Sequence, residues 1–565
     1  MKKTIILLSC LLLSLLQLQG AEQPRERVYI STDKEVYVAG DAVWLSAWCL
    51  DTADGRLSEF SKIAYVELHS PTGMVQTAKV ALEGGRGAGR LMLPTTLPTG
   101  NYRLFAYTRL GASEEGFDPL TGARTLSVFN IFSTERTAGV KVVGEAPQAA
   151  ASPTDGTLEI RTAPTPRKQV STVTLTNRGT QPVDFCLSVR HDDGIPAPAG
   201  ARLADFVSAV KALPAARGFD ASVIPEYEGE IIRCRVTGTD EDGLEALQGK
   251  HIFLSAPGSG ENLYTETLEH GSSSFFTANI YGDRELFLEI EGLDQKDGGH
   301  LELESPFLDL PAGEIPPLQL WSGWASALEL RGLGMQLGKT FDAEGLYDHL
   351  DVNAHQIFDL RERVRYVLDD YRRFPLMEEL FIEFISEIRV RRVGGKRELQ
   401  IRMPDHNGSS YFPTSSALVL LDGIPVLDHE RMLAYDPLLV QYVDIYEGSY
   451  FFGTRNYAGV VNFVTYKGTL PSMQFADNVR IVDFQGCGLP VAFGLTDFGA
   501  GSGVPAGCPD YRQTLCWLPA MTLAPGESFT FKCKTPAYGG RFDIVAEGLD
   551  AQGGAVSGRA TLDAR

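Results

Sequence analysis

The sequence predicts a mainly β protein made of tandem β-sandwich domains, with one α+β domain and a connecting helix. Short runs of alternating apolar and polar residues recur along most of the chain, and this period of two is typical of strands with one buried face. Turns that contain glycine or proline separate the runs, as they do in antiparallel sheets. At 565 residues the chain is also too long for one hydrophobic core, so we expect several domains in series.

The N-terminal residues have the pattern of a secretory signal peptide. Two lysines precede an apolar run that ends in small residues near Gly20 and Ala21, which is the order found in cleaved export signals. The apolar run continues beyond Cys10, which argues against lipidation at that cysteine. We therefore expect residues 1–20 to be removed and the mature chain to be exported, to the periplasm, the outer membrane or the cell surface.

Charge and hydropathy exclude some classes of partner. The formal net charge is −21, which argues against nucleic acid or an anionic lipid surface as the main partner. No later segment is long and apolar enough to span a bilayer as a helix, so we expect no transmembrane span.

The cysteines do not suggest a metal site. Four fall near the end of the chain with spacings that do not match a CxxC zinc site, although an oxidising compartment would permit disulfides. These are Cys487, Cys508, Cys516 and Cys533. Three more, Cys49, Cys186 and Cys234, lie in strand-like runs and are predicted to be small buried side chains.

From about Val28 to Ser133 the pattern predicts the first β-sandwich, with turns at Gly40–Asp41 and Thr72–Gly73. The order of its pieces resembles the second macroglobulin-like domain of the macroglobulin family, which has a Thr-Asp-Lys-x-x-Tyr-x-x-Gly-Asp/Glu motif after a strand. The motif residues here are Thr32, Asp33, Lys34, Tyr37, Gly40 and Asp41, followed by Pro71 to Gly73 and by Pro98, Gly100 and Tyr102. The family's usual proline before the motif glycine is Ala39 here.

The run "QGCGLP" raises the question of an internal thioester, which macroglobulins form between a cysteine and a nearby glutamine. In that family the glutamine lies three residues after the cysteine. Here Pro490 holds that place, and Gln485 lies before Cys487 instead. We expect no thioester.

A linker rich in alanine and proline covers residues 138–156, and strand patterns then predict a second sandwich. The four strand-like runs after it resemble the carboxypeptidase regulatory-like domain, although the glycine-phenylalanine signature of that domain is only loosely matched near Phe275. Beyond Pro317, Ile357, Leu360 and Val364 recur at helical spacing, which predicts a long helix over residues 352–374.

The segment that follows resembles the plug domain of TonB-dependent outer-membrane receptors over about ninety residues. The matching residues are Leu418, Val419, Asp422, Gly423, Pro425, Val443, Ile445, Gly448, Gly453, Gly459, Val461 and Thr465. Asp422–Gly423 is predicted to close a hairpin, and Gly453 and Gly459 to allow tight turns. Only 565 − 468 = 97 residues follow, too few for a receptor barrel. If this module acts as a plug, we therefore expect it to contact a barrel on another chain. The alternative is that it has kept the plug fold and lost the plug function.

The last segment predicts another sandwich and resembles the terminal β-domain of long bacterial surface proteins. The combination of macroglobulin-like and plug-like modules resembles multidomain exported proteins of Bacteroidetes-type bacteria. The predicted boundaries are a signal peptide at 1–20, a macroglobulin-like sandwich at 21–137, a linker at 138–156, a sandwich at 157–226, a carboxypeptidase regulatory-like domain at 227–318, a helical connector at 319–370, a plug-like domain at 371–468 and a C-terminal sandwich at 469–565.

Enzyme signatures are not found, so we expect no catalytic, cofactor-binding or metal-binding residue. "RHDDG", with His191, Asp192 and Asp193, offers metal ligands but is better explained as a polar hairpin tip. Asp428 in "DHE" is predicted to start a helix. The acidic runs "GTDEDG" and "GLDQKDGG" lack the spacing of a calcium loop.

The sequence thus predicts a non-catalytic exported binding or scaffold protein that engages a protein partner in the cell envelope, with an outer-membrane barrel as one candidate partner. The predicted contact residues lie in an aromatic, glycine-rich stretch of the plug-like segment, because aromatic residues are enriched at interface cores. They are Tyr450, Phe451, Phe452, Arg455 and Tyr457. The alternative is that these aromatics pack inside the module. The alternative functions are a macroglobulin-like protease inhibitor or trap without a thioester, and a degenerate TonB-dependent receptor component that acts with a separate barrel.

Overall fold

The computed structural model describes residues 25–148, 154–214, 218–258, 262–291, 299–341, 347–350, 363–405, 407–452, 455–476, 478–493 and 509–565. The predicted signal peptide, Cys10, Cys508 and Gly453 lie outside the described residues. The chain divides into two compact units. Unit 1 comprises Met1–Tyr227, Asp309–Leu350 and Pro490–Arg565, and unit 2 comprises Glu228–Leu308 and Asp351–Leu489. The fold is mainly β, with sandwiches in series, as predicted.

The first sandwich of unit 1 has strands in the order β2-β8-β7-β1-β3-β6, and β4 pairs with both β5 and β7. Its strands are β1 (Glu26–Thr32), β2 (Val36–Val38), β3 (Ala42–Asp51), β4 (Ile63–Ser70), β5 (Gly73–Ala81), β6 (Arg86–Met92), β7 (Gly100–Tyr107) and β8 (Arg124–Phe129). Alternate residues fill one core, for example Ala64, Val66 and Leu68 of β4. The predicted turns at Gly40–Asp41 and Thr72–Gly73 are confirmed, since each joins two strands.

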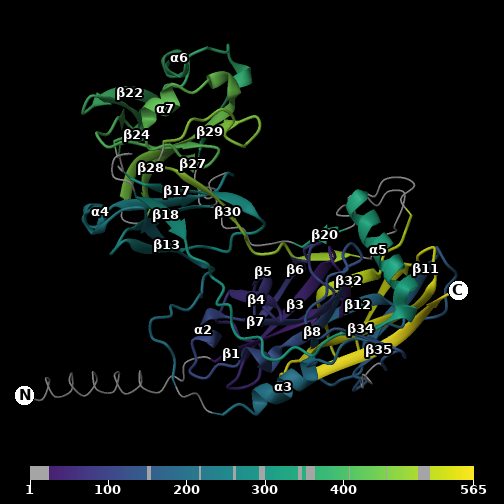
Figure 1. Cartoon of the computed structure of the whole chain (residues 1–565). Coiled ribbons are helices and arrows are strands. Elements are labelled where there is room, and N and C mark those ends of the chain that lie inside the picture. Colours follow the sequence, from purple (N-terminus) through teal and green to yellow (C-terminus); the bar gives the residue numbers. More distant parts are fainter. Residues whose placement is uncertain are drawn as a thin grey trace, which may run out of the picture. The chain divides into compact units, whose positions relative to one another are not determined.

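The second sandwich of unit 1 is assembled from distant parts of the chain. One sheet has the order β10-β11-β33 and the other the order β20-β31-β32-β12-β34-β35. Its strands are β10 (Leu158–Arg161), β11 (Val170–Asn177), β12 (Val183–Asp192), β20 (Tyr347–His349), β31 (Val491–Phe493), β32 (Thr514–Leu523), β33 (Ser528–Lys534), β34 (Gly540–Asp550) and β35 (Ala555–Ala564). In Figure 1 the yellow C-terminal strands lie beside β12.

The prediction of separate sandwiches at 157–226 and 469–565 is therefore wrong. Strand β12 is hydrogen-bonded on both sides to C-terminal strands, over Val183–Arg190 by β32 and over Val183–Asp192 by β34. The earlier segment supplies only three strands, which cannot close a sandwich alone. An alternating pattern shows that a segment forms strands but does not show which segment pairs with it.

The remaining elements of unit 1 connect and cover these sheets. They are α2 (Arg109–Ala112), η1 (Pro119–Gly122), β9 (Lys141–Val143), α3 (Leu203–Lys211), β19 (Gln319–Trp321), η3 (Ser322–Trp324) and α5 (Ala325–Thr340). Strand β19 runs parallel to β9. Among the described helices none is both long and apolar enough to cross a membrane.

The prediction of a helix over residues 352–374 is wrong for the part of that segment that the structure describes. Residues 351–362 lie outside the described part of the chain, and β21 (Val364–Val367) is a strand that pairs with β28 (Val440–Phe452) of unit 2. Two β-branched valines and a tyrosine favour an edge strand there. The long helix is instead α5, whose glycines at 332, 334 and 338 weaken its helical signal in the sequence.

Unit 2 begins with a small sandwich whose two sheets share one core. The sheets have the orders β16-β13-β18 and β15-β14-β17-β30. Its elements are β13 (Ile231–Thr237), α4 (Glu241–Leu247), β14 (His251–Ser255), β15 (Leu263–Thr267), β16 (Ser272–Phe276), β17 (Arg284–Ile290), β18 (His300–Leu303) and β30 (Arg480–Phe484). Strand β30 comes from the predicted C-terminal sandwich but pairs with β17 in this domain, so that boundary is also wrong.

The α+β part of unit 2 has the sheet order β21-β28-β29-β26-β27, with β26 parallel to β29. Its other elements are η5 (Leu368–Asp370), α6 (Met377–Glu383), β22 (Ile388–Val393), β23 (Lys396–Ile401), β24 (Met403–Pro404), β25 (Ser410–Tyr411), β26 (Leu418–Leu421), β27 (Ile424–Pro425), α7 (His429–Leu433), η6 (Pro437–Leu439), β28 (Val440–Phe452) and β29 (Arg455–Thr465).

Two local predictions in this α+β part are confirmed. Asp422 and Gly423 form the two-residue turn between β26 and β27, with φ of 47° and 82°, as a tight hairpin requires. Asp428 caps α7, because its side chain accepts a hydrogen bond from the Glu430 amide. At Gly459, with φ of 90°, a Cβ would lie 2.8 Å from Ile401.

Candidate functional site

Unit 1 contains a cavity of about 430 Å³ that we call the arginine cavity. Its lining residues come from six separate stretches of the chain. They are Lys34, Glu35, Val36, Arg124, Thr125, Arg190, His191, Asp192, Asp193, Gly194, Ile195, Pro196, Ala197, Pro198, Ala199, Gly200, Ala201, Arg202, Arg331, Asp543 and Arg559. This volume lies within the range typical of small-ligand sites.

The macroglobulin-like motif forms one wall of the arginine cavity. Asp33 is fully buried, and its carboxylate accepts hydrogen bonds from the Tyr37 hydroxyl at 2.8 Å and from the Thr514 hydroxyl at 2.6 Å. These bonds fix the turn between β1 and β2, where Lys34 and Glu35 lie, against strand β32 of the second sandwich. The motif aspartate therefore acts as a structural anchor that positions the charged wall.

Glu35 lies between two arginines. The Arg124 Nη2 and Arg190 Nη1 atoms are each 2.8 Å from a Glu35 carboxylate oxygen. Burial alone would raise the pKa of Glu35, but the charges of Arg190 and Arg124 outweigh it and lower the pKa below its ordinary value. Glu35 therefore stays ionised at neutral pH.

Helix α5 closes another wall through Arg331. This guanidinium donates to Asp193 at 2.6 and 3.0 Å and to the Val36 carbonyl at 2.7 Å. Both side chains of the pair are about 5% exposed or less. Burial tends to raise the pKa of Asp193, but the Arg331 charge lowers it overall. A two-pronged pair of this kind holds the loop 193–202 in place.

The lining carries an excess of positive charge. Six cationic side chains line the arginine cavity, namely Lys34, Arg124, Arg190, Arg202, Arg331 and Arg559, and four anionic ones, namely Glu35, Asp192, Asp193 and Asp543. With His191 neutral, the difference is 6 − 4 = +2, in a chain whose net charge is −21. The lining side chains thus carry an excess of positive charge, although Lys34 and Arg124 also pair with Asp41 at 3.3 Å and Glu547 at 3.7 Å, which lie outside the lining.

Two of these arginines retain free donor nitrogens. Arg190 uses Nη1 for Glu35 and the Asp33 carbonyl, and Arg559 uses Nη2 for Asp543. Among the described residues, no hydrogen bond joins a protein acceptor to Nε or Nη2 of Arg190, or to Nε or Nη1 of Arg559. These atoms can bind a ligand without breaking an existing ion pair.

The "RHDDG" residues do line this cavity, although they do not converge as metal ligands. His191 Nδ1 lies 3.2 Å from the Gln513 side-chain oxygen, Asp192 faces Arg541 at 3.6 Å, and Asp193 is bound by Arg331. Burial lowers the pKa of His191, which favours its neutral form. The prediction of a hairpin tip at this run is wrong: β12 ends at Asp192, but the chain then runs through the loop 193–202 into helix α3 and not into a neighbouring strand.

A smaller cavity of about 160 Å³, which we call the proline pocket, adjoins the first. The two share Thr125 and the loop residues Ile195 to Ala199. The aromatic wall consists of Phe129 and Trp324, whose rings meet edge to face at 6.2 Å. The prolines that line it are Pro147, Pro196, Pro198, Pro316 and Pro317.

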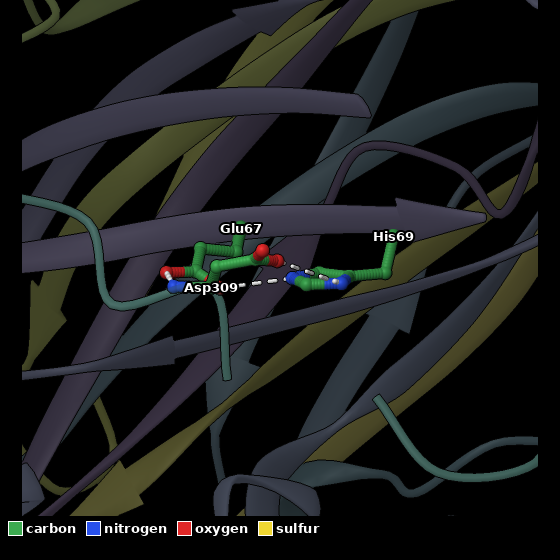
Figure 2. A group of neighbouring side chains, drawn as sticks. All are labelled: Glu67, His69 and Asp309. Carbon is green, nitrogen blue, oxygen red and sulfur yellow. Dashed lines mark hydrogen bonds and ion pairs between the residues drawn. The ribbon is translucent and has the colours of Figure 1, made fainter. Parts of the chain in front are cut away.

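A second charged group in unit 1, the Glu67 cluster, consists of Glu67, His69 and Asp309 (Figure 2). Tyr65, Glu67 and His69 alternate with the core residues of β4 and so share its other face. Glu67 Oε1 accepts from the Tyr107 hydroxyl at 2.6 Å and from the Asp309 amide at 3.1 Å. Its Oε2 bonds to His69 Nε2 at 2.8 Å and accepts from the Leu310 amide at 3.2 Å.

The Glu67 cluster is thus a closed hydrogen-bonded arrangement. Glu67 is fully buried and both its oxygens are used by protein donors, so its carboxylate fixes the chain where it re-enters unit 1 at Asp309. Burial would raise the pKa of Glu67, but hydrogen bonds from His69 and Tyr107 lower it overall. The three residues could offer one ligand atom each to a metal, but only by displacing these bonds.

The predicted partner-binding residues lie on the hairpin β28–β29 of unit 2. Three of them are buried in a cluster with Phe253 and Leu263 of the small sandwich, namely Tyr450, Phe452 and Tyr457. Arg455 forms an ion pair with Glu291, and Phe451 is 73% exposed. The alternative that these aromatics pack inside the fold describes the three buried ones, because alternate residues of a strand face opposite sides.

Cys487 lies in an irregular strand-like segment of unit 2. Its amide donates to the Ile280 carbonyl at 2.7 Å, and the Gly282 amide donates to the Cys487 carbonyl at 2.9 Å. A Cβ at Gly486 would lie 2.2 Å from the Gly282 carbonyl oxygen, which explains the glycine beside this cysteine. The absence of a thioester stays a prediction.

Sequence reasoning did not find the arginine cavity because its charges come from distant segments. The available signal was an arginine at one end of a strand-like run rich in apolar residues, as with Arg124 before "TLSVF" and Arg190 after "DFCLSV". A buried strand position seldom takes an unpaired arginine. The sequence did not show that Glu35 pairs with both.

No family model matches this chain, and no curated protein matches it. Solved structures with some similarity include trypsin-activated alpha-2-macroglobulin from Escherichia coli, at 9% identity and a TM-score of 0.24, over 97% of this chain and 42% of that one. The native E. coli alpha-2-macroglobulin gives the same identity and TM-score, over 97% and 40%. The E. coli adhesin FdeC gives 12% and 0.14, over 50% and 64%. This chain spans less than half the length of these macroglobulins.

Proposed function

We propose that this chain is a non-catalytic binding protein of the bacterial cell envelope that engages a protein partner through unit 1. The observation that carries the proposal is the arginine cavity, whose charged walls are held in place by the two sandwiches and α5 while about 430 Å³ remains open. Export and an envelope location follow from the N-terminal sequence pattern and form part of the proposal.

The chemistry of the cavity favours binding over catalysis. Its carboxylates at Glu35 and Asp193 have lowered pKa values and are paired with arginines, so they are poor proton donors and weak bases at neutral pH. The one hydroxyl in the lining, that of Thr125, accepts a hydrogen bond from Arg103 at 3.2 Å. A nucleophile needs an adjacent base that can take its proton. The lining supports charge recognition instead.

The test is capture of partners from an envelope extract by the full mature chain. We expect a captured protein that is lost with the double substitution Arg190→Gln, Arg559→Gln, and retained with the control Arg161→Gln. The Arg161 side chain is 68% exposed, and among the described residues its ion pair is with Glu159 on the same strand, β10. Capture that does not change with the double variant, or no capture at all, would contradict a binding function of this cavity.

A further inference from the structure

We infer that the arginine cavity binds a carboxylate group of a peptide segment, and that an apolar side chain of the same segment enters the proline pocket. This rests on the proposed function and names its ligand class. The carboxylate is either the C-terminus of the partner or an aspartate or glutamate side chain, and the experiment below separates the two.

The sign of the ligand charge follows from the lining. An excess of two positive charges persists after every carboxylate in the wall is counted, and the rest of the chain is strongly acidic. A partly enclosed positive site strengthens attraction for an anion, because the surrounding protein has a lower effective dielectric than water. The net charge of the chain is negative, so an anion is on average disfavoured elsewhere on its surface.

The free nitrogens set the geometry of recognition. Arg190 offers Nε and Nη2 on one edge of its guanidinium while Nη1 remains on Glu35. Two adjacent N–H groups of one arginine match the two oxygens of a carboxylate. Because Glu35 already orients Arg190, little side-chain entropy is lost when the ligand binds.

The monoanionic carboxylate fits better than a dianionic phosphate. Four carboxylates line the cavity, and each is bound to or faces an arginine. A net excess of +2 could balance either anion, but the second negative charge of a phosphate would lie in a cavity that Asp192 and Asp543 also line. Like charges at short range disfavour binding.

The adjoining proline pocket indicates that the ligand has an apolar part. It shares Thr125 and residues 195–199 with the arginine cavity, so one ligand can reach both. Phe129 and Trp324 form an aromatic wall, and five prolines and Leu318 add apolar surface, although Asn101, Ser127, Gln148 and Gln319 also line the pocket. An anionic group next to an apolar side chain is what an acidic or C-terminal peptide segment provides.

The experiment measures fluorescence anisotropy of a labelled peptide, Ala-Pro-Ala-Leu-Glu-Leu, with the full mature chain. Four forms are compared: the free acid, the C-terminal amide, the form with Gln in place of Glu, and the form with both carboxylates neutral. We expect the doubly neutral form to bind at least about tenfold more weakly than the free acid, which corresponds to the loss of one charge-assisted hydrogen-bonded pair. The two single forms show which carboxylate is recognised.

Substitutions in the arginine cavity test whether the peptide binds there. Arg190→Gln and, separately, Arg559→Gln should each weaken binding of the free acid about tenfold or more, while Arg161→Gln should not change it. Arg559 is 36% exposed, so its substitution keeps the test valid even where Arg190→Gln lowers stability. Binding of the neutral peptide within twofold of the free acid, displacement of the peptide by inorganic phosphate at lower concentration than by acetate, or unchanged binding in both variants would overturn the inference.

Failure of this inference is distinguishable from failure of the proposed function. Where a partner is captured and lost in the double variant but no peptide form binds, the ligand class is wrong and the binding function stands. Where peptides bind in a charge-dependent manner that both variants abolish, the ligand class is supported directly.

Discussion

The arginine cavity and the Glu67 cluster both place carboxylates inside unit 1, but they differ in how the protein satisfies those charges. At Glu67 every partner comes from the protein: a tyrosine hydroxyl, a histidine and two backbone amides occupy both oxygens. In the cavity each carboxylate is paired, yet Arg190 and Arg559 keep nitrogens that no described residue uses.

This comparison separates a charge that stabilises the fold from a charge that can recognise a ligand. A buried carboxylate costs several kcal/mol of desolvation, roughly, unless its hydrogen bonds are complete. The Glu67 cluster meets that condition, because both oxygens of Glu67 are hydrogen-bonded to other groups of the protein. In the cavity the buried carboxylates of Glu35 and Asp193 are bound by arginines, while Arg190 and Arg559 keep donor nitrogens beside the open volume. We expect substitutions at the first to change stability and substitutions at the second to change binding.

The largest expected effect is at Glu67. Glu67→Ala removes the acceptor for four donors, two of them backbone amides at the re-entry of the chain, and should lower the free energy of unfolding by about 3–5 kcal/mol. Urea denaturation followed by circular dichroism measures this. A loss below about 1 kcal/mol would show that water can replace the carboxylate.

Arg331→Ala should have the next largest effect on stability. It leaves Asp193, which is 4% exposed, without its two-pronged partner, so a loss of about 2–4 kcal/mol is expected. The loop 193–202 should also become more accessible to limited proteolysis. Intact cleavage resistance with unchanged stability would mean that the loop is held by its prolines alone.

Arg190→Gln should have a small effect on stability and a large effect on peptide binding. Glu35 keeps Arg124 at 2.8 Å, so we expect a loss of stability of only about 1 kcal/mol, together with the tenfold or greater weakening of peptide binding described above. A large loss of stability with unchanged peptide binding would mean that Arg190, like Glu67, stabilises the fold and does not recognise a ligand.

The pH dependence of Glu67 gives a smaller, more specific effect. Its folded-state pKa lies below the unfolded value, which is about 4.3 for a glutamate. The stability that it contributes is therefore present above that value and is lost as the pH falls through the folded-state pKa. The difference in unfolding free energy between wild type and Glu67→Gln should shrink over this acid range. A difference that stays constant from neutral to acid pH would contradict the assignment.

The sequence predicted local features well where a short stretch decides them. The Asp422–Gly423 hairpin and the Asp428 helix start depend on residues within a few positions, and both are confirmed. Partners across the sheets could not be predicted: β12 pairs with strands more than three hundred residues later, and no pattern within either segment encodes that choice.

The candidate site shows the same division. The sequence shows a polar run at His191, Asp192 and Asp193, and in the structure these residues line the arginine cavity. Their role depends on Arg331 and Gln513, which other segments supply. The aromatic stretch at Tyr450 predicted an exposed contact, but three of its four aromatic side chains are buried, which the sequence alone left as an open alternative.

The most direct test of a ligand carboxylate in the arginine cavity is a double-mutant cycle between Arg190 and the peptide. The free-acid and doubly neutral peptides are titrated against wild type and Arg190→Gln. A direct contact predicts that neutralising the peptide costs at least about 1 kcal/mol less in the variant than in the wild type, because the partner is already gone. Equal costs in the two proteins, within error, would mean that the carboxylate does not contact Arg190.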